Sequence, residues 1–435
     1  MLGGYVTRIL LCWELGTDYQ HLLSLQSIAR FYQGKGYEVW VAGRDVTKLK
    51  RLFSDVKINV VQAPFADSAA DLGVEKQAPR SYADFLRRCG FHHADALSGL
   101  VSAWRNLFSF VKPDLLLCDH APVALLSARG LSAGGRFING SSFLGRFSEP
   151  ESVGKIAVGV PFSVPDDNRP AGVFFTGDLA TNDVVRFEDE LVKVINKVCI
   201  EFSIPRINNL ADLFADFDKC IFQTYSELDH YGYRSAEQRH KTSYVGSAVP
   251  EFSEPAIFPH FKGPKIYCHV KGSAETPILL KTLQAIECSA IVLVDGIPDS
   301  IINAHKSRHI LYVDKPVSMR DVLGKSTFAI LNGGINSVSL FMKMGIPVAL
   351  FPLHIEQFLM AKRVEALNAG VQLNLSSVDS ALQGLQKVNG RQKKVAAGLF
   401  EEKYQSESAH NELLLQLALV EQNFLLEKLK SYPKF

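Results

Sequence analysis

The sequence predicts an α/β protein built from two doubly wound, Rossmann-like domains. Apolar segments of strand length alternate with amphipathic segments of helical length, which is typical of parallel sheets covered by helices on both faces. The alternation occurs twice, before and after a segment from Gly246 to Pro264 that is rich in Pro, Gly, Phe and Ser. A chain of 435 residues is also long for one core. We therefore predict an N-terminal domain over 1–245, a linker over 246–262, a C-terminal domain over 263–405 and a tail over 406–435.

The first domain begins with a strand at Tyr5–Cys12 and a helix at Leu22–Gln33. The helix has apolar residues along one face, and the glycines that follow it end it. Another long helical stretch covers Asp178–Phe202. Apolar segments predict further strands at Glu38–Ala42, Ile58–Gln62, Leu115–Cys118, Arg136–Asn139 and Cys220–Gln223.

The second domain repeats this architecture without repeating the residues themselves. Its predicted strands are Lys265–Val270, Ile291–Val294, His309–Val313, Thr327–Leu331 and Pro347–Phe351. Helices are predicted at Val338–Met344 and at Ile355–Asn368, with Gly370 ending the second one. The tail, Ser406–Lys430, has the pattern of one or two amphipathic helices.

Composition excludes several classes of protein. A net charge of +2 is too small to indicate nucleic-acid binding, and no apolar run approaches the length of a membrane span. The amino terminus lacks the layout of a signal peptide. Seven cysteines are scattered singly, mostly within apolar runs, which is typical of reduced thiols in a buried core. We expect a cytoplasmic protein, in which the sequon at Asn139 is not used; peripheral contact with a membrane is left open.

A glycine-rich turn at Asn332-Gly-Gly-Ile-Asn-Ser337 predicts a phosphate site. It connects a strand to a helix, so several backbone N–H groups lack partners and the positive end of the helix dipole lies beside them. Glu356 and Gln357 open the next helix at the same predicted edge of the sheet. Lys271-Gly-Ser273 follows the first strand of this domain and could add donors, although an ordinary turn explains it as well. A nucleotide-type ligand is the first inference.

Two residues of the first domain are candidates for proton transfer. His21 lies where the first predicted strand leads into the first helix, and a histidine there can act as a general base. Asp119 directly follows the strand Leu115–Cys118, so its carboxylate could orient the imidazole. Taken singly, each has a plain structural alternative: a hydrogen-bonded first-turn histidine, and an N-cap for the helix beginning near Pro122.

Other chemistries have weaker support. Asp216 and Asp218 have the spacing of a metal-binding pair, but a solvated helix end is the simpler interpretation. Cys89 with His92 and His93 has no second ligand pair for zinc. Neither a Walker loop nor a complete GxGxxG motif follows the first strand, which argues against an ATPase or a dehydrogenase.

The stretch from Thr327 to Asn368 resembles the donor-binding region of glycosyltransferase family 1. The matching residues are Asn332-Gly-Gly-Ile-Asn-Ser337, Gly345-Ile-Pro347 and Glu356-Gln357. Further likeness lies in the opening CWELG segment and in LLLCDHAPVALLSARG, QTYSELDHYGYR and YVGSAV. The chain looks most like bacterial proteins of this family, in the UDP-glucuronosyl- and glucosyltransferase-like subgroup, that begin with a Trp-Glu-Leu-Gly segment.

The resemblance implies a GT-B fold and an inverting transferase that uses a UDP or dTDP sugar. It implies that His21 takes the proton from an acceptor hydroxyl while Asp119 orients and stabilises the imidazole. The implied donor-binding residues are Ser273, Asn332, Gly333, Gly334, Asn336 and Ser337 near the diphosphate, and Glu356 and Gln357 at the sugar hydroxyls. A helix end would stabilise the leaving group, so neither a metal nor another cofactor is expected. The C-terminal helix is expected to cross back onto the first domain.

Three positions depart from the family pattern. Asn332 stands where the family has a phosphate-contacting histidine, and it cannot become cationic. Leu340 stands where a glutamate usually meets the ribose, which favours a donor without the 2′-hydroxyl, such as a thymidine diphosphate sugar. The loop Gly16-Thr-Asp-Tyr-Gln20 is bulkier than the glycine-rich loop of relatives.

These departures motivate an alternative: an inactive relative that binds a sugar nucleotide or supports a partner transferase. A sugar-nucleotide epimerase would need acidic residues in the cleft that the sequence does not identify. The acceptor is open, whether small molecule, lipid or protein. Two stretches, Tyr82–Ser109 and Phe143–Thr176, carry many aromatic residues that could form its wall or could equally belong to the core: Phe85, Phe91, Trp104, Phe108, Phe143, Phe147, Phe162, Phe174 and Phe175.

Overall fold

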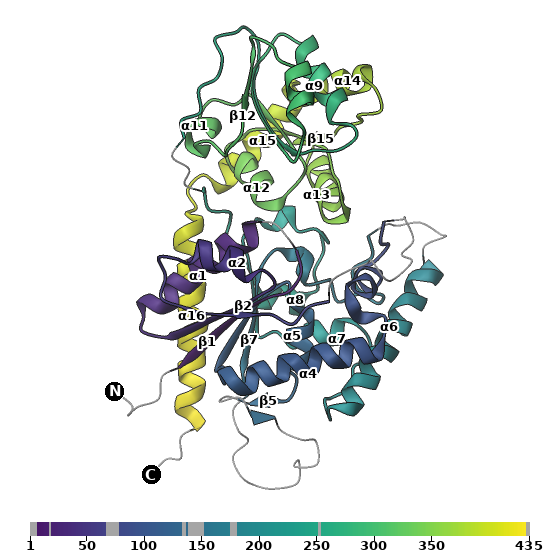
Figure 1. Cartoon of the computed structure of the whole chain (residues 1–435), viewed down its shortest axis with the longest axis vertical. Helices are drawn as coiled ribbons and strands as arrows, with labels where there is room; N and C mark the ends of the chain where they lie inside the picture. Colours follow the sequence, from purple (N-terminus) through teal and green to yellow (C-terminus); the bar gives the residue numbers. More distant parts are fainter. Residues whose placement is uncertain are drawn as a thin grey trace. The chain divides into compact units, whose positions relative to one another are not determined.

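The computed structural model describes residues 7–16, 19–66, 78–132, 136–137, 152–174, 181–250 and 254–431. Contacts within the chain divide it into two compact units, each with its own parallel sheet (Figure 1). Unit 1 consists of Met1–Gln223, Tyr233–Val245 and Asn411–Phe435, and unit 2 of Thr224–Gly232 and Gly246–His410. The short segment Thr224–Gly232 therefore groups with the second unit, although it lies inside the range 1–245.

Seven parallel strands form the sheet of unit 1, in the order β3-β2-β1-β4-β7-β8-β9. They are β1 (Arg8–Trp13), β2 (Glu38–Gly43), β3 (Asn59–Gln62), β4 (Leu115–Asp119), β7 (Gly154–Gly159), β8 (Lys219–Phe222) and β9 (Thr242–Tyr244). The chain winds outward from β1 to β2 and β3, then returns to the other side of β1 to form β4. The winding therefore reverses between β1 and β4, which is where doubly wound folds bind their ligands.

Helices cover this sheet, and a C-terminal helix completes its core. The helices are α1 (Tyr19–Gly34), α2 (Val46–Leu52), α3 (Tyr82–Leu86), α4 (Ala94–Val111), α5 (Pro122–Ser127), α6 (Thr181–Glu201), α7 (Ala211–Phe214), α8 (Ala236–Lys241) and α16 (Ala409–Ser431). Leu413, Leu417 and Val420 of α16 are buried in the same apolar cluster as α1 and β1. Burying each such side chain contributes about 1.5–3 kcal/mol. This packing fixes α16 on unit 1.

Six parallel strands form the sheet of unit 2, in the order β12-β11-β10-β13-β14-β15. They are β10 (Lys265–Lys271), β11 (Ser289–Asp295), β12 (Ile310–Val313), β13 (Phe328–Leu331), β14 (Val348–Leu350) and β15 (Gly370–Gln372). The helices are α9 (Thr276–Ala285), α10 (Asp299–Ala304), α11 (Met319–Leu323), α12 (Ile335–Lys343), α13 (Ile355–Ala366), α14 (Val378–Val388) and α15 (Arg391–Tyr404). The winding reverses between β10 and β13, as it does in unit 1 between β1 and β4.

The predicted fold class, two doubly wound parallel sheets, is confirmed, while some elements differ. Arg136–Phe137 pairs antiparallel with Leu131–Ser132 in a separate two-stranded sheet, so its assignment to the main strand series was wrong. β7 takes the place beside β4 instead. The rest of the predicted strand, 138–139, lies outside the described residues.

The end of α13 also differs from the prediction. The helix ends at Ala366, and Asn368 adopts a left-handed φ of 55° directly after it, as C-terminal residues of helices often do. Gly370 instead opens β15, where a Cβ atom would lie 2.3 Å from the carbonyl oxygen of Val348. Close approach of β14, not helix termination, therefore requires this glycine.

The cysteines match the expectation of unpaired thiols that are mostly buried. All seven cysteines are free thiols, six of them buried and Cys89 half-buried. Among the described residues, no helix has both the length and the apolar character needed to cross a bilayer.

Candidate functional site

The candidate proton-transfer residues meet at the point where the sheet of unit 1 reverses its winding. Asp119 is the last residue of β4 and pairs in register with Trp13, the last residue of β1. His21 lies in the first turn of α1, which follows β1. The Nδ1 atom of His21 and the Oδ1 atom of Asp119 are 2.8 Å apart. His21 is 8% exposed and Asp119 is fully buried, so solvent screens their interaction little.

This contact decides the chemistry available to the imidazole. When a carboxylate accepts the Nδ1–H of a neutral histidine, the basic lone pair lies on Nε2. A buried carboxylate in this position would also stabilise an imidazolium formed by protonation of Nε2. The other oxygen of Asp119, Oδ2, has no hydrogen-bond partner among the described residues. The pair thus has the arrangement of a general base and its orienting carboxylate.

Two glycines leave room for this pair. Gly16 has a φ of 85°, and a Cβ atom there would lie 2.4 Å from Nε2 of His21. Gly159, at the end of β7, has a φ of 97°, and its Cβ atom would lie 2.5 Å from Oδ1 of Asp119. Such contacts are shorter than van der Waals separation, so a side chain at either position would displace the pair.

The segment Trp13-Glu-Leu-Gly16 shapes the loop before His21. The indole Nε1 of Trp13 donates to the carbonyl oxygen of Leu15 at 2.9 Å, and the Leu15 amide donates to His120. The buried carboxylate of Glu14 accepts from the amides of Val123 and Ala124 at the start of α5. Burial raises the pKa of Glu14 to about 8, against the lowering effect of these amides. This role of Glu14 is not visible in the sequence, because its partners lie on a helix more than a hundred residues away.

His120 differs from its neighbour Asp119 in that it belongs to an aromatic cluster. Its ring stacks against Tyr82 and Phe85 and meets Phe162 edge-on. Full burial, with a smaller effect of His21, lowers the pKa of His120 to about 3. His120 is therefore a neutral packing residue at physiological pH.

The aromatic residues proposed for an acceptor wall are mostly core residues. Phe91, Trp104 and Phe108 are fully buried, and Phe162 and Phe174 are buried as well. Phe85 is half-buried. The remaining members, Phe143, Phe147 and Phe175, lie outside the described residues.

In unit 2 the predicted phosphate turn lies at the equivalent reversal point, between β10 and β13. Asn332 follows β13, and its side chain links two neighbouring strand ends. Its Oδ1 accepts from the Lys271 amide at 2.7 Å, and its Nδ2 donates to the Phe351 carbonyl at 2.8 Å. Asn332 is 8% exposed. Half of its hydrogen-bonding capacity, one lone pair and one N–H, is therefore used inside the unit, which the sequence did not indicate.

The residues after Asn332 retain the expected free donors. Gly334 is the N-cap of α12, and no side chain caps this helix end. The amides of Ile335, Asn336 and Ser337 have no acceptor in a preceding turn, and the described residues provide none. The Oδ1 atom of Asn336 is buried and likewise has no partner among the described residues. At Gly333, with a φ of 105°, a Cβ atom would lie 3.0 Å from the carbonyl oxygen of Gln357.

The turn after β10 has fewer free hydrogen-bond donors for a ligand than predicted. The amide of Lys271 is bound to Asn332, that of Gly272 donates to Asp295 at 2.7 Å, and that of Ser273 donates to the Thr276 hydroxyl at 2.9 Å. These amides are therefore committed within the unit. The half-buried Ser273 hydroxyl accepts from the Glu275 amide at 3.3 Å and lies 3.3 Å from the Thr276 hydroxyl, and it could still serve a ligand.

The two residues predicted at the sugar open α13 as expected. Gln357 is buried, and its Oε1 accepts from the Leu353 amide at 2.8 Å, which leaves its amide nitrogen for another partner. Glu356 is partly exposed and lies 3.9 Å from Nε2 of His230. Leu340, one of the departures from the family pattern, is buried, with 4% of its surface exposed.

A second histidine–carboxylate pair lies at this edge and was not predicted. Nε2 of His269 in β10 is 3.1 Å from Oδ2 of Asp295, the last residue of β11. The hydrogen bond from His269 is the main cause that lowers the pKa of Asp295. Register between β10 and β11 pairs Asp295 with Lys271, so a prediction of strand pairing would have found this cluster.

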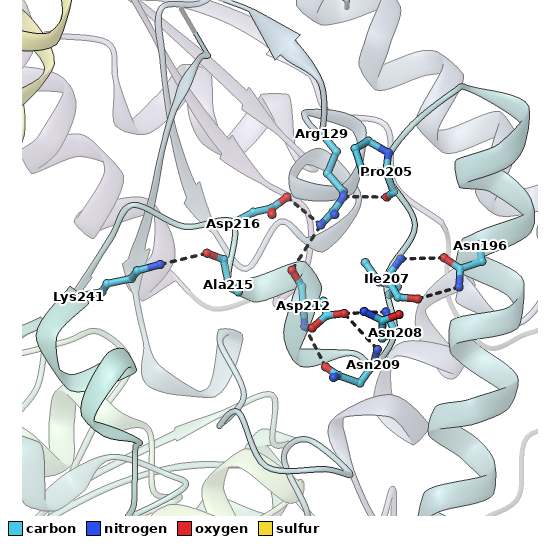
Figure 2. A network of polar contacts seen from close by, with 10 residues as sticks. All are labelled: Arg129, Asn196, Pro205, Ile207, Asn208, Asn209, Asp212, Ala215, Asp216 and Lys241. Carbon is cyan, nitrogen blue, oxygen red and sulfur yellow. Dashed lines mark hydrogen bonds and ion pairs between the residues drawn. The ribbon is translucent and has the colours of Figure 1, made fainter. Parts of the chain in front are cut away.

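The weaker metal hypotheses find no support among the described residues, where no group of three His, Cys, Asp or Glu side chains could hold an ion. Figure 2 shows the guanidinium of Arg129 pointing toward Asp216, at 2.9 Å, and toward the Pro205 carbonyl. Asp218 accepts from the Lys155 amide. Both carboxylates are thus engaged, and Asp216 is part of a polar network, not a solvated helix end.

Comparison with known proteins identifies solved structures with a similar fold. No family model matches the sequence, and no curated protein is significantly similar to it. Among solved structures, the glycosyltransferase of kitacinnamycin has 13% identity and a TM-score of 0.69, covering 97% of this chain and 100% of that chain. The calicheamicin glycosyltransferase CalG4 has 12% identity and a TM-score of 0.63, covering 96% and 98%. Spinosyn rhamnosyltransferase SpnG, solved with thymidine diphosphate, has 14% identity and a TM-score of 0.55, covering 94% and 99%.

These likenesses extend over nearly the whole length of each chain. They confirm the GT-B fold that the sequence resemblance implied.

Proposed function

We propose that this protein is a metal-independent glycosyltransferase that moves a sugar from a nucleoside diphosphate sugar to an acceptor hydroxyl with inversion. The observation that carries the proposal is the buried contact of 2.8 Å between His21 and Asp119 at the winding reversal of unit 1. The fold shared with glycosyltransferases adds support, because it supplies a nucleotide-binding type of sheet edge in unit 2.

The proposed reaction is a single displacement. Nε2 of His21 takes the proton of the acceptor hydroxyl while the hydroxyl oxygen attacks the anomeric carbon of the sugar. The bond from that carbon to the diphosphate oxygen breaks, and the nucleoside diphosphate leaves with the electron pair. Attack from the face opposite the leaving group inverts the anomeric centre. Asp119 holds Nδ1 and stabilises the imidazolium.

The leaving diphosphate would be held at the start of α12. Its negative charge suits the uncapped amides of Ile335, Asn336 and Ser337 and the positive end of the helix dipole. The Ser273 hydroxyl, in the turn after β10, is a further candidate donor. The side chain of Asn332 is tied to the Lys271 amide and the Phe351 carbonyl, and it keeps one N–H that could serve the diphosphate.

Further residues of unit 2 would contact the donor or influence which donor binds. Gly333 and Gly334 let the backbone approach the diphosphate, and Glu356 with the free amide of Gln357 would bind sugar hydroxyls. Leu340 is buried and apolar, so it offers nothing to a ribose 2′-hydroxyl. Thymidine diphosphate, which SpnG binds, lacks that hydroxyl. We favour a dTDP sugar over a UDP sugar on this ground.

A thermal-shift screen of nucleotide sugars tests the proposal without knowledge of the acceptor. A ligand that binds the folded chain at a hundred times its Kd adds about 2.7 kcal/mol to stability, so the melting temperature reports the donor. Release of nucleoside diphosphate from that donor in the presence of mixed acceptors then tests transfer. Absence of any stabilising nucleotide sugar would contradict the proposal.

The second candidate is a relative without activity that binds a sugar nucleotide or supports a partner transferase. The commitment of Asn332 to backbone groups and the burial of Leu340 favour it, because both weaken the donor site. Calorimetry with nucleoside diphosphates separates the two candidates. Binding without any release of nucleoside diphosphate from the donor would favour the inactive relative.

A further inference from the structure

Glu14 is a buried carboxylate to which the proposed reaction gives no part. It directly follows β1 and is 1% exposed. Its Oε2 atom accepts a hydrogen bond from the Val123 amide at 3.0 Å, and its Oε1 atom accepts one from the Ala124 amide. Burying a carboxylate is unfavourable unless hydrogen bonds compensate for the lost water. Here both compensating bonds come from one distant segment of the chain, which indicates a specific task for the side chain.

Helix α5 depends on Glu14 for acceptors at its start. Pro122 opens the helix and has no N–H, and the N-cap residue, Ala121, provides no side-chain acceptor. The next two amides have no acceptor within the helix, and Glu14 supplies one for each. Because α5 begins shortly after Asp119, Glu14 fastens the end of β1 to the segment that leaves Asp119.

The loop that Glu14 fastens also touches His21. A hydrogen bond of 3.1 Å from the Leu15 amide to the His120 carbonyl adds a second tie to the same segment. Gly16 comes next, and a Cβ atom there would lie 2.4 Å from Nε2 of His21. The backbone at Gly16 therefore lies against the atom that takes the proton in the proposed reaction. Since only Leu15 separates Glu14 from Gly16, a displaced Glu14 would disturb this contact.

Trp13 holds the same loop from the other face of the sheet. Successive side chains of an extended chain point to opposite faces, and Trp13 packs in the apolar core beside α1 while Glu14 meets α5. The Trp13 ring stacks on the imidazole of His21 with ring centres 6.2 Å apart. Its indole N–H donates to the Leu15 carbonyl at 2.9 Å. An apolar anchor and a polar anchor thus fix the loop on its two sides.

We propose that Glu14 is a positioning residue, whose carboxylate anchors the loop after β1 to the start of α5 and so keeps the imidazole of His21 aligned with Asp119. The catalytic consequence rests on the proposed function, whereas the effect on the histidine–carboxylate pair does not. Hydrogen bonds to a charged acceptor are among the stronger ones in proteins. Glu14→Gln leaves one acceptor oxygen and places an NH₂ group against a backbone N–H, so it should release one of the two bonds.

The tautomer of His21, read from the nitrogen NMR shifts of its ring, tests this without nucleotide or acceptor. His21→Gln identifies the ring signals by their loss. We expect the wild-type ring to carry its proton on Nδ1, facing Asp119. Glu14→Gln should lower the ratio of the Nδ1–H form to the Nε2–H form about tenfold, the equivalent of one lost hydrogen bond. Work at about pH 9 keeps imidazole neutral and Glu14 ionised, since burial raises the pKa of Glu14 to about 8.

Glu188→Gln is the matched control. Glu188 lies in the same unit, is 2% exposed and likewise accepts from two backbone amides, those of Ala171 at 2.7 Å and Leu210 at 3.1 Å. The same chemical change there should leave the tautomer ratio of His21 unaltered. In steady-state kinetics Glu14→Gln should lower kcat about tenfold with the KM for the donor unchanged, and Glu188→Gln should change neither.

An unaltered tautomer ratio in Glu14→Gln would overturn the inference, as would an equal change in Glu188→Gln, because Glu14 would then be a purely structural residue. If Glu14→Gln does not fold, Glu14→Asp takes its place, since it keeps the carboxylate on a shorter stem. The ratio should fall in that variant too, and an unaltered ratio would again overturn the inference. A ratio that depends on Glu14 in a wild-type chain that transfers no sugar would support the positioning role and reject the transferase.

Discussion

His21 and Asp119, 98 positions apart in the chain, lie 2.8 Å from each other because β1 and β4 are neighbours in the sheet. The carboxylate is fully buried and the imidazole nearly so. Asp119 ends β4 and His21 lies in the first turn of the helix that follows β1, at the point where the winding reverses, so the fold itself creates the pair.

Asp119→Asn should lower the rate of nucleoside diphosphate release by about a hundredfold or more, because an amide cannot stabilise the imidazolium. Asp114→Asn is the control: Asp114 precedes the same strand, is equally buried and binds the Arg8 amide. Rates measured per folded molecule should fall only in Asp119→Asn. Equal losses in the two variants would mean that Asp119 is structural.

Gly16→Ala should abolish release while leaving nucleotide affinity unchanged. Its methyl group would collide with Nε2 of His21, and its φ of 85° adds backbone strain. Gly36→Ala has the same strain, with a φ of 84°, but open space around the added carbon. Comparison of the two variants by kinetics and calorimetry therefore isolates the collision. Activity in Gly16→Ala that matches Gly36→Ala would contradict the proposed position of the base.

Asn332→Ala should destabilise unit 2 by about 2–3 kcal/mol, since it removes two partly buried hydrogen bonds and leaves the Lys271 amide without its partner. Asn374→Ala removes one exposed local bond and should cost well under half of that. Urea unfolding followed by circular dichroism measures both. Tryptophan fluorescence reports only unit 1, which holds all three tryptophans, and serves as the internal reference. A loss in Asn332→Ala no larger than in the control would refute this role.

His120 should make unit 1 sensitive to acid. Its pKa of about 3 lies below the ordinary value of 6.5, so the unfolded chain binds the proton more readily. The contribution of neutral His120 to the stability of unit 1 is complete above pH 6.5 and is lost as the pH falls toward 3. From pH 7.5 to 5.5 the free energy of unfolding of the wild type should fall by about 1.4 kcal/mol more than that of His120→Asn. Asparagine is chosen because it tolerates the left-handed backbone at this position. Tryptophan fluorescence in urea measures this, and identical losses would contradict it.

The sequence was most informative where function coincides with a strand end. His21, Asp119 and Asn332 were placed correctly at the sheet edges because apolar strands and glycine-rich turns are local signals. Pairing between strands is not local, so the sequence could not show that Arg136–Phe137 leaves the main sheet.

Hydrogen bonds between side chains and distant backbone groups are the other feature that the sequence did not predict. Asn332 was expected to keep a hydrogen bond for phosphate, and the backbone groups of Lys271 and Phe351 take half of its hydrogen-bonding capacity, which the sequence did not indicate. The sequence predicted no role for Glu14, although its carboxylate accepts a hydrogen bond from an amide at the start of α5. Both partnerships join distant segments, and no periodicity in the chain reports them.

The most direct test is a comparison of His21→Ala with the wild-type chain, using the donor that the thermal-shift screen selects. We predict that His21→Ala binds the nucleoside diphosphate with unchanged affinity by calorimetry, while its release of nucleoside diphosphate in the presence of acceptors falls at least about a hundredfold. Undiminished release by His21→Ala, with the nucleotide still bound, would contradict the assignment of His21 as the base.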